Sequence, residues 1–348
     1  MKKATAIILS IFAAAAIVGG VILWNYLRDN KLPAFAQTTE LYVYPDTPVQ
    51  SVIDSLIVNG APKWPQRLSK VFADHSVETG MKPGHYVVPA GQPAVYVARM
   101  LNNGWQTPVK MTLSGTLRLR GEIARKISSQ MMVDSASVRA AFEDKEMLAG
   151  FGFTPETVFA MLIPDTYEMY WTDDVKTIFA RQKKAYDAFW TPENEAKAKS
   201  LGLSKMQVSI VASIVSGESN HVPEFNKIAG VYLNRLNKGM KLQADPTIAF
   251  CYGYTVRRIY RNMLSFESPY NTYKYAGLPP GPIYVPTKNT LNAVLNPDFG
   301  GGNLFFCADP SFNGSHRFAK TYGEHLQNAR AFQKALNIRM AEKKKANE

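Results

Sequence analysis

Residues 206–236, MQVSIVASIVSGESNHVPEFNKIAGVYLNRL, contain the pattern around which the rest of the chain is organised. Val211, Ile214 and Val215 recur at three- and four-residue intervals, the spacing that makes one apolar stripe along a helix. Glu218 falls on that stripe, so the periodicity points its carboxyl group toward the buried face. Burial disfavours the charged form of a carboxyl group and raises its pKa, which makes Glu218 a candidate proton donor near neutral pH.

The two residues before Glu218 support a different interpretation. Ser216 and Gly217 are poor helix formers. If the helix lost its register there, Glu218 would swing out into water and have no chemical role. The spacing alone leaves both interpretations open.

The second half of the same segment predicts another helix, which starts at Pro223 and ends at Gly239. A short polar turn joins the two helices into a hairpin, with Glu218 beside the turn. The apolar stripe of the second helix consists of Phe225, Ile228, Ala229, Tyr232 and Leu236.

Polar loops are predicted after the hairpin, at 242–247 (LQADPT) and 270–273 (YNTY), and the second leads into 277–283 (GLPPGPI). Amide and carboxyl groups suit sugar hydroxyls, and aromatic rings cover the apolar faces of sugar rings. The same residue types are also common in plain surface turns. Each loop taken singly therefore fits a sugar site and an ordinary turn equally well.

Length and charge restrict the class of protein. The 348 residues are enough for two domains, or for one domain with a membrane tether and a tail. The net charge is +12, but no basic run interleaved with aromatic residues and no zinc-finger spacing occurs, which argues against nucleic acid as a partner. An anionic wall polymer or an anionic lipid surface suits this charge. The basic residues at 336–348 predict a solvated helix end.

Cysteine and histidine are too sparse for a metal or disulfide framework. Two cysteines, Cys251 and Cys307, exclude a disulfide scaffold and a Cys-based zinc site, and we favour two buried free thiols over a single bridge. His316 and His325 lie nine residues apart, which is not a ligand spacing on one helical turn. His316 has no carboxylate beside it in the sequence. We therefore predict no metal site and a hydrogen-bonded structural role for both histidines.

The N-terminal region predicts a membrane anchor. Residues 4–24 carry no charge over 21 positions, which is enough helix to cross a bilayer core of about 30 Å. A signal peptide would have a shorter apolar region, and no small-residue cleavage site precedes Asn25. Trp24 and Tyr26 fit interfacial anchors. We predict a single-pass helix within residues 1–30, in the inner (cytoplasmic) membrane, and the rest of the chain outside the cytoplasm.

An internal repeat follows the predicted anchor. The sequence YVYP at 42–45 returns as YVVP at 86–89, and each copy leads to an Asn-Gly pair, at 59–60 and 103–104. Both copies predict a strand followed by a helix that ends at the Asn-Gly pair. Neither copy can hold a core alone, so the two should pack into one small α+β module over 38–130. A plain spacer and a glycan-binding module are both open.

Residues 131–204 predict connecting helices and a hinge. A strand at 109–113 precedes this region, and a helix follows it through Leu119, Ile123 and Ile127. Asp134 predicts one helix cap, and Thr191-Pro192 predicts the start of another helix. Pro164 favours an extended conformation for 163–167, IPDTY. The fold class is therefore α+β, and the larger mixed α/β domain at 205–335 carries the chemistry.

These motifs together resemble the YceG-like family of membrane-anchored endolytic murein transglycosylases. The similarity is dense over roughly 205–330, and 163–167 with the preceding double strand-helix module resembles the family's LysM-like portion. The motifs that carry the resemblance are IVSGESN, VYLNRL, MKLQADPT, YNTY, GLPPGPI, Phe305-Phe306, His316-Arg317-Phe318 and His325. The chain departs from the family pattern at Ser216-Gly217 and at Ser114.

The resemblance implies that Glu218 is the single catalytic residue. It further implies substrate-binding roles, and the candidate residues are Gln243, Asp245, Asn271, Tyr273 and Asn234. In this family the C6 hydroxyl of N-acetylmuramic acid attacks its own glycosidic carbon and closes a 1,6-anhydro ring, so one acid is sufficient and no cofactor is needed. The implied partners are peptidoglycan strands, the cytoplasmic membrane and the peptidoglycan synthases, whose nascent strands such an enzyme cuts in mid-chain as a terminase.

Two alternatives remain. A muramidase would hydrolyse the same bond with water, and it would need a second acid near Glu218, for which Asp245, Asp165 and Glu267 are available. A non-enzymatic scaffold would tether the membrane to the wall through the repeated module.

Overall fold

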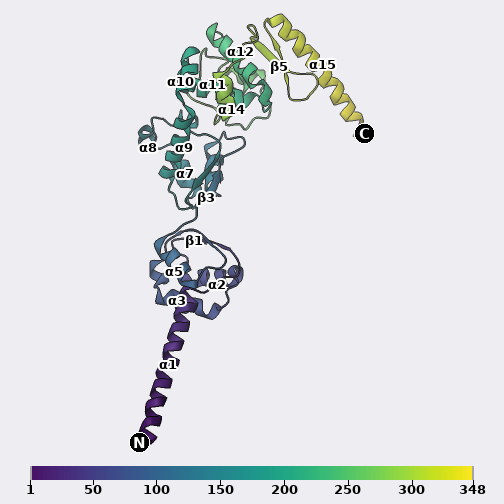
Figure 1. The fold of residues 1–348 in the computed structure, drawn as a ribbon. Helices are drawn as coiled ribbons and strands as arrows, with labels where there is room; N and C mark the ends of the chain where they lie inside the picture. The colour runs from purple at the N-terminus through teal and green to yellow at the C-terminus, as the bar shows by residue number, and fades with distance from the viewer. Residues whose placement is uncertain (1, 347–348) are drawn as a thin grey trace. The chain divides into compact units, whose positions relative to one another are not determined.

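The computed structural model describes residues 2–346, and the chain folds as two compact units (Figure 1). The first unit comprises Met1–Met111, Gln130–Met132 and Glu168–Asp173. The second comprises Thr112–Ser129, Val133–Tyr167 and Asp174–Glu348. Helices alternate with three two-stranded sheets, so the predicted mixture of helix and sheet is confirmed.

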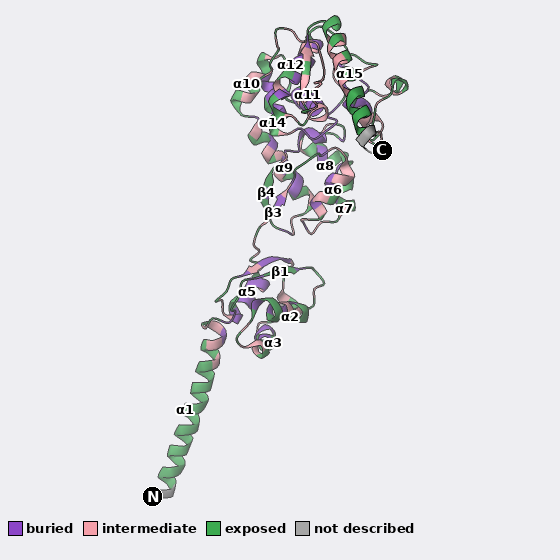
Figure 2. Ribbon diagram, turned by 90° about the vertical axis from the view of Figure 1, so that its right-hand side faces the viewer, coloured by how far each residue is buried: buried purple, intermediate pink, exposed green. Residues whose placement is uncertain are grey.

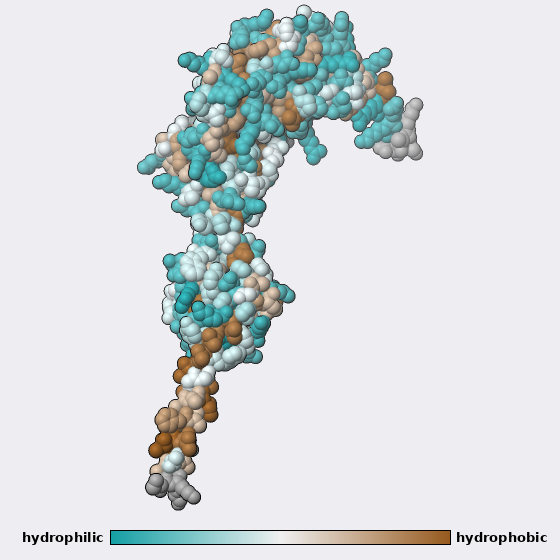
Figure 3. Space-filling model, viewed as in Figure 1, coloured by the Kyte–Doolittle hydropathy of each residue, from teal (hydrophilic) through white to brown (hydrophobic). Residues whose placement is uncertain are grey.

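Helix α1 (Lys2–Asn30) starts the first unit. Within it, Ala4–Asn30 has a mean hydropathy of 2.7 and is long and apolar enough to cross a membrane. The described side chains before Trp24 are all exposed, and their surface is strongly apolar (Figures 2 and 3). A helix of this kind occurs in membrane anchors and in signal sequences.

The internal repeat forms the rest of the first unit. Strand β1 (Thr39–Val43) is followed by α2 (Val49–Gly60), and β2 (Gly84–Val88) by α5 (Ala94–Asn103), so the strand-helix prediction is confirmed for both copies. The two strands pair antiparallel, with Leu41 opposite Tyr86. Two short helices, α3 (Pro65–Asp74) and α4 (Val77–Gly80), lie between the copies in the sequence. Residues from both copies share one core with Phe72 of α3, and they include Leu41, Val43, Leu56, Tyr86, Val97 and Leu101.

The two Asn-Gly pairs behave differently. Gly104 caps α5 in the left-handed conformation (φ 66°), as predicted. In the first copy the predicted cap is wrong by one residue, because α2 includes Gly60 and the left-handed residue is Ala61 (φ 44°). A Cβ atom at Gly60 would lie 3.0 Å from Cδ1 of Phe35 and 3.1 Å from Oγ1 of Thr39. Glycine is therefore needed at position 60 for close packing and not for the turn.

Strands β3 (Val109–Thr112) and β4 (Thr166–Met169) pair with each other. The helices around them are α6 (Arg120–Ser128), α7 (Ser135–Ala141), α8 (Lys145–Gly150), η1 (Val158–Ala160), α9 (Val175–Phe189) and α10 (Pro192–Ser200). The two caps predicted here are confirmed. Asp134 accepts a hydrogen bond from the backbone N of Ser137, and Thr191 accepts one from Asn194.

Helix α11 (Lys205–Glu218) is the central helix of the second unit. It is buried on all sides from Val208 to Val215, a wider surface than the single predicted stripe (Figure 2). The Ser213 hydroxyl donates to the Ile210 carbonyl (2.7 Å) and accepts from the Ile283 backbone N (3.0 Å). A serine on this helix therefore satisfies its polar group inside the core.

The remaining elements pack around α11 or follow it. They are η2 (Val222–Glu224), α12 (Phe225–Asn237), α13 (Asp245–Cys251), η3 (Arg261–Ser265), α14 (Lys288–Leu295), β5 (Phe305–Ala308), β6 (His316–Ala319) and α15 (Tyr322–Ala346). Helices α12, α13 and α14 contact α11, and α15 contacts the β5–β6 hairpin. The basic residues at 336–346 continue α15, whereas residues 347–348 of the predicted tail and the side chains of Lys344 and Lys345 lie outside the described part.

The prediction of a loop over 242–247 is wrong in its second half. Helix α13 begins at Asp245, directly after Ala244. Pro246 lies in the first helical turn, where its missing N–H costs nothing and its fixed φ favours the helix.

Candidate active-site groove

Glu218 is the last residue of α11 and stays in helical register, because Ser216 and Gly217 do not interrupt the helix. The Ser216 hydroxyl donates to the Ala212 carbonyl (2.9 Å), and its oxygen lies 3.0 Å from Oγ1 of Thr290 on α14, within hydrogen-bond distance. The alternative in which Glu218 loses the helix is therefore wrong. The glutamate is half-buried.

Gly217 permits close packing beside the glutamate. A Cβ atom at position 217 would lie 2.6 Å from Cβ of Pro246 and 2.9 Å from Cε2 of Tyr284. Real Cβ contacts are essentially never that short. The glycine thus lets the first turn of α13 reach the end of α11.

The hairpin of α11 and α12 supplies the nearest partner of Glu218. The Tyr232 hydroxyl on α12 donates a hydrogen bond to Oε1 of Glu218. Tyr232 is buried, and a buried phenol needs such a partner. Its pKa is raised well above the ordinary value, chiefly by burial and then by the charge of Glu218, so the phenol remains a donor.

The pKa of Glu218 is raised to about 7. Burial is the main cause, and the negative charge of Asp245 acts in the same direction. The Tyr232 hydrogen bond and the positive charge of Arg235 oppose the rise. At neutral pH a large share of the Glu218 carboxyl groups therefore carries a proton.

Glu218 borders three cavities of the second unit, and we call their combined surface the Glu218 groove. The first, of about 260 Å³, has walls that include Tyr232, Arg235, Gln243, Asp245, Tyr273, Phe305, Phe306, Tyr322 and His325. The second, of about 210 Å³, also includes Asp245 and extends to Arg118, Tyr254, Arg257, Arg258 and Tyr284. The third, of about 620 Å³, includes Ser219, His221, Asp309, Phe312, His316, Phe332 and Arg339. Glu218 is the residue that lines all three.

Three of the predicted binding residues line the first cavity with Glu218. Asp245 lies in the first turn of α13 and accepts a hydrogen bond from the Tyr273 hydroxyl (2.5 Å). Gln243 adopts a left-handed backbone conformation (φ 50°), which is unfavourable for a residue other than glycine. Its backbone N donates to the Thr272 carbonyl (3.1 Å), which fixes the strained residue beside the cavity.

The structure places Asn271 and Asn234 outside the three cavities that border Glu218. Asn271 is fully buried, its amide donates to the Leu264 and Phe266 carbonyls, and its carbonyl accepts from the backbone N of Tyr273. Asn234 donates to the carbonyls of Phe299 and Asn303. The amide nitrogens of both residues donate to backbone carbonyls and hold the loops around them.

Arg235 is a groove residue that sequence reasoning missed. Its side chain is buried and donates to the carbonyls of Leu304 (2.6 Å) and Leu242 (2.8 Å). Its guanidinium carbon lies 5.1 Å from the centre of the Phe305 ring. The sequence contained a signal for it, because Arg235 lies three residues after Tyr232 and directly before Leu236 of the predicted stripe, and a buried arginine needs carbonyl or carboxylate partners.

The two histidines differ from each other. His316 places Nδ1 2.9 Å from Oε2 of Glu224, and its backbone N donates to Oε1 of the same residue (3.0 Å). It therefore has a carboxylate beside it, which its sequence neighbours do not reveal because Glu224 is 92 positions away. His325 stacks on Phe305 (5.4 Å between ring centres), and within residues 2–346 its buried Nδ1 has no hydrogen-bond partner. Among the described residues, the ring of His325 thus has stacking on Phe305 in place of a hydrogen bond at Nδ1.

Cys251 and Cys307 are free thiols and are half-buried rather than fully buried. Burial raises the pKa of both thiols. Among the described residues, no three His, Cys, Asp or Glu side chains gather as metal ligands.

The chain is similar to proteins of one known family. The model of the YceG-like family matches residues 41–331. An endolytic murein transglycosylase of Bacillus subtilis is 26% identical over 330 residues, which cover 89% of both chains. One of Streptococcus pneumoniae is 25% identical over 94% of this chain, which spans only 64% of that relative.

A solved structure shares the fold. The 2.6 Å crystal structure of a YceG-like protein from Listeria monocytogenes aligns with a TM-score of 0.55 at 24% identity. The alignment covers 84% of this chain and 98% of the Listeria chain.

Proposed function

Because this chain belongs to the YceG-like family, we propose that it is an endolytic murein transglycosylase that cleaves the MurNAc-GlcNAc β-1,4 bond. The observation that carries the proposal is the position of Glu218, whose carboxyl group has a pKa of about 7 and which lines three cavities. A proton donor in that position can reach a bond in the middle of a polymer whose two sides extend into different cavities.

In the proposed reaction, Glu218 first donates its proton to the glycosidic oxygen, and the bond from that oxygen to the MurNAc C1 carbon breaks. The resulting Glu218 carboxylate then accepts the proton of the MurNAc C6 hydroxyl while that oxygen bonds to C1. The products are a free GlcNAc hydroxyl and a 1,6-anhydro-MurNAc end. The proton removed equals the proton supplied, so a single carboxyl group suffices.

Tyr232 and Arg235 are suited to hold the intermediate carboxylate. The Tyr232 hydroxyl already donates to Glu218, and the Arg235 charge favours the ionised form. Asp245 acts in the opposite direction and restores the affinity of Glu218 for a proton. We assign Gln243, Asp245 and Tyr273 to substrate contact, and Asn234 and Asn271 to support of the loops around the groove.

A muramidase is the second candidate, and Asp245 is the observation that favours it. This carboxylate lines two of the cavities that Glu218 borders, so it could activate a water molecule there. The other acids considered are less suitable. Asp165 is paired with Lys288 and Glu267 with Lys274, and neither lines the Glu218 groove.

The first unit suits a tether. We propose that α1 anchors the chain in the cytoplasmic membrane, with the second unit outside the cytoplasm, and that the strand-helix repeat is LysM-like and holds glycan. Exposed Tyr42 and Tyr44 both pack edge-on against Trp171, and together they offer aromatic faces to sugar rings. In this arrangement the enzyme would act near peptidoglycan synthases and terminate nascent strands. Residues 38–130, 131–204 and 205–335 would then serve as module, connecting hinge and catalytic domain.

The test uses full-length protein in detergent, incubated with purified sacculi and followed by mass spectrometry of the released fragments. We expect 1,6-anhydro ends from the wild type and at least a thousandfold lower rate from Glu218→Gln, with Glu267→Gln as the matched control that keeps activity. Reducing ends in place of anhydro ends would identify a muramidase. No cleavage by the wild type, with binding to sacculi retained, would identify a scaffold.

A further inference from the structure

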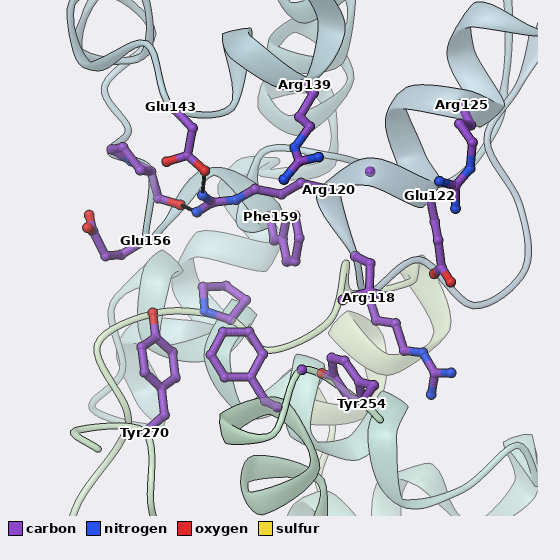
Figure 4. A pocket seen from close by; sticks show the side chains of 16 residues that line it. Arg118, Arg120, Glu122, Arg125, Arg139, Glu143, Glu156, Phe159, Tyr254 and Tyr270 are labelled. Atoms are coloured by element: carbon purple, nitrogen blue, oxygen red, sulfur yellow. Dashed lines mark hydrogen bonds and ion pairs between the residues drawn. The ribbon is translucent and has the colours of Figure 1, made fainter. Parts of the chain in front are cut away.

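A fourth cavity of the second unit, of about 510 Å³, is not bordered by Glu218. Its charged lining consists of four arginines and three glutamates: Arg118, Arg120, Arg125, Arg139, Glu122, Glu143 and Glu156 (Figure 4). It lies between α6 and the segment that follows α13. Its volume is in the range of sites for small ligands. Its apolar lining includes four aromatic side chains, Phe159, Phe250, Tyr254 and Tyr270, beside Leu119, Pro155 and Pro282. The reaction proposed above does not use any of these side chains.

The cavity adjoins the Glu218 groove. Arg118 and Tyr254 line both this cavity and the groove's 210 Å³ cavity, which Glu218 borders. The guanidinium carbon of Arg118 lies 4.7 Å from the centre of the Tyr254 ring. The Tyr254 hydroxyl is in turn fixed on the Ile283 carbonyl (2.5 Å). A ligand in the groove can therefore extend a branch past Arg118 into this cavity.

The four arginines exceed the three glutamates of the lining by one positive charge, and among the described residues only Arg120 of the four forms an ion pair. Arg118 is half-buried, and Arg125 and Arg139 are exposed. Arg120 pairs with Glu143 and also donates to the Pro155 carbonyl (Figure 4). Within residues 2–346, no ion pair engages Arg118, Arg125 or Arg139. Arg257 and Arg258 add positive charge to the adjoining 210 Å³ cavity.

We propose that this cavity binds the acidic peptide branch that murein strands carry on the lactyl group of MurNAc, an inference that rests on the proposed function. Guanidinium groups pair with carboxylates in a bidentate geometry, and the aromatic walls cover small apolar side chains. A branch that starts at the sugar beside Glu218 reaches the arginines by passing Arg118. The site selects peptide-bearing strands over bare ones.

The test compares full-length wild type with Arg139→Ser and Arg125→Ser on two substrates, glycan strands with intact peptides and the same strands after enzymatic removal of the peptides. We expect the wild type to have a kcat/KM at least tenfold higher on the peptide-bearing strands, mainly through KM. Each variant should lower this ratio about fivefold, the effect of losing one charge-assisted contact. Arg139→Lys should restore part of it, and Arg330→Ser, an exposed substitution on α15, should leave it at the wild-type value.

A binding measurement separates this inference from the proposed reaction. Fluorescence polarisation with a labelled acidic tetrapeptide of small side chains should show saturable binding that weakens with salt and falls about tenfold in the double variant Arg125→Ser, Arg139→Ser. Loss of the wild-type cleavage with intact peptide binding would reject the reaction alone. Equal cleavage of the two substrates by the wild type, or absence of peptide binding, would reject the peptide site.

Discussion

At the scale of single residues, the chemistry depends on one carboxyl group whose proton is retained by its surroundings. Burial raises the pKa of Glu218 from 4.5 to about 7, and Tyr232 and Arg235 limit the rise. A pKa near the working pH lets one group donate and then accept the same proton. The surroundings of Glu218 therefore determine how cleavage activity depends on pH and how much the carboxylate lowers the free energy of unfolding.

The raised pKa has a stability consequence with a definite sign. Because the folded pKa of Glu218 lies above its unfolded value, its contribution is most favourable below pH 4.5 and is lost as pH rises through about 7. Glu218→Gln removes the buried charge, so we expect the variant to be more stable than the wild type at pH 8 by about 2 kcal/mol, and equal to it at pH 4. Urea unfolding at the two pH values measures this. A variant less stable at pH 8 would show that the Glu218 carboxylate is well solvated.

Tyr232→Phe is expected to move the pH profile of cleavage. The wild type should lose activity above about pH 7, where Glu218 loses its proton. Removal of the Tyr232 hydroxyl takes away a donor that favours the carboxylate, so the pKa of Glu218 should rise and the alkaline limb of kcat should shift upward by about one pH unit. The rate should also fall about tenfold, because the carboxylate formed in the first step loses its donor. Tyr96→Phe, an exposed substitution on α5, serves as the control. A lower rate with an unmoved profile would mean that Tyr232 only fills space.

At the scale of secondary-structure elements, the site depends on how closely helices meet at the end of α11. The Tyr232 hydroxyl comes from α12, and the Asp245 carboxylate from the first turn of α13. Helix α12 meets α11 at Glu218 through the Tyr232 hydroxyl, and α13 meets α11 at Gly217 through Pro246. A small change in the distance between α11 and α13 therefore changes the environment of the acid.

Gly217→Ala tests this close packing. The new Cβ would collide with Pro246 and Tyr284, so we expect α13 to move, with a loss of about 1–3 kcal/mol of stability and at least a tenfold loss of activity. Gly150→Ala, at the end of α8 with open space around it, should change neither by much. Thermal unfolding and the sacculus assay measure both effects. A fully active Gly217→Ala enzyme would show that the groove does not need this spacing.

At the scale of the whole molecule, an apolar helix leads into the first of two folded units. Its most apolar 18-residue window, within Ala4–Asn30, is not covered by any described part of the protein. An exposed apolar surface of this size is unfavourable in water, so it requires a bilayer or removal by cleavage.

The proposed anchor makes a direct prediction about the mature protein. The protein isolated from membranes should retain residues 1–30 in its intact mass and should resist extraction by alkaline carbonate. A chain that starts after residue 30 would show a cleaved signal sequence. Substitution of Ile11 and Val18 by Lys should release the chain from the membrane, because charges at the bilayer centre cost several kcal/mol.

The sequence predicted the local features well, because these depend on neighbours within a few residues. The stripe of α11, the caps at Asp134 and Thr191, and both copies of the strand-helix repeat follow from periodicity and side-chain chemistry. The errors at Gly60 and at 242–247 share one cause. Glycine can end a helix or allow close packing, and proline can form a loop or begin a helix. The packing around Gly60 and Pro246 decided for close packing and for a helix start.

What the sequence determined by itself was that Glu218 lies on an apolar helix face, because a helical repeat fixes which residues share a side. The tertiary structure alone decided that Tyr232, Arg235 and Asp245 surround that carboxyl group and set its pKa. It also decided that Asn271 supports a loop and that Arg118 connects two cavities. These relations join residues on different elements, and their distances are set by how the helices pack rather than by any local repeat.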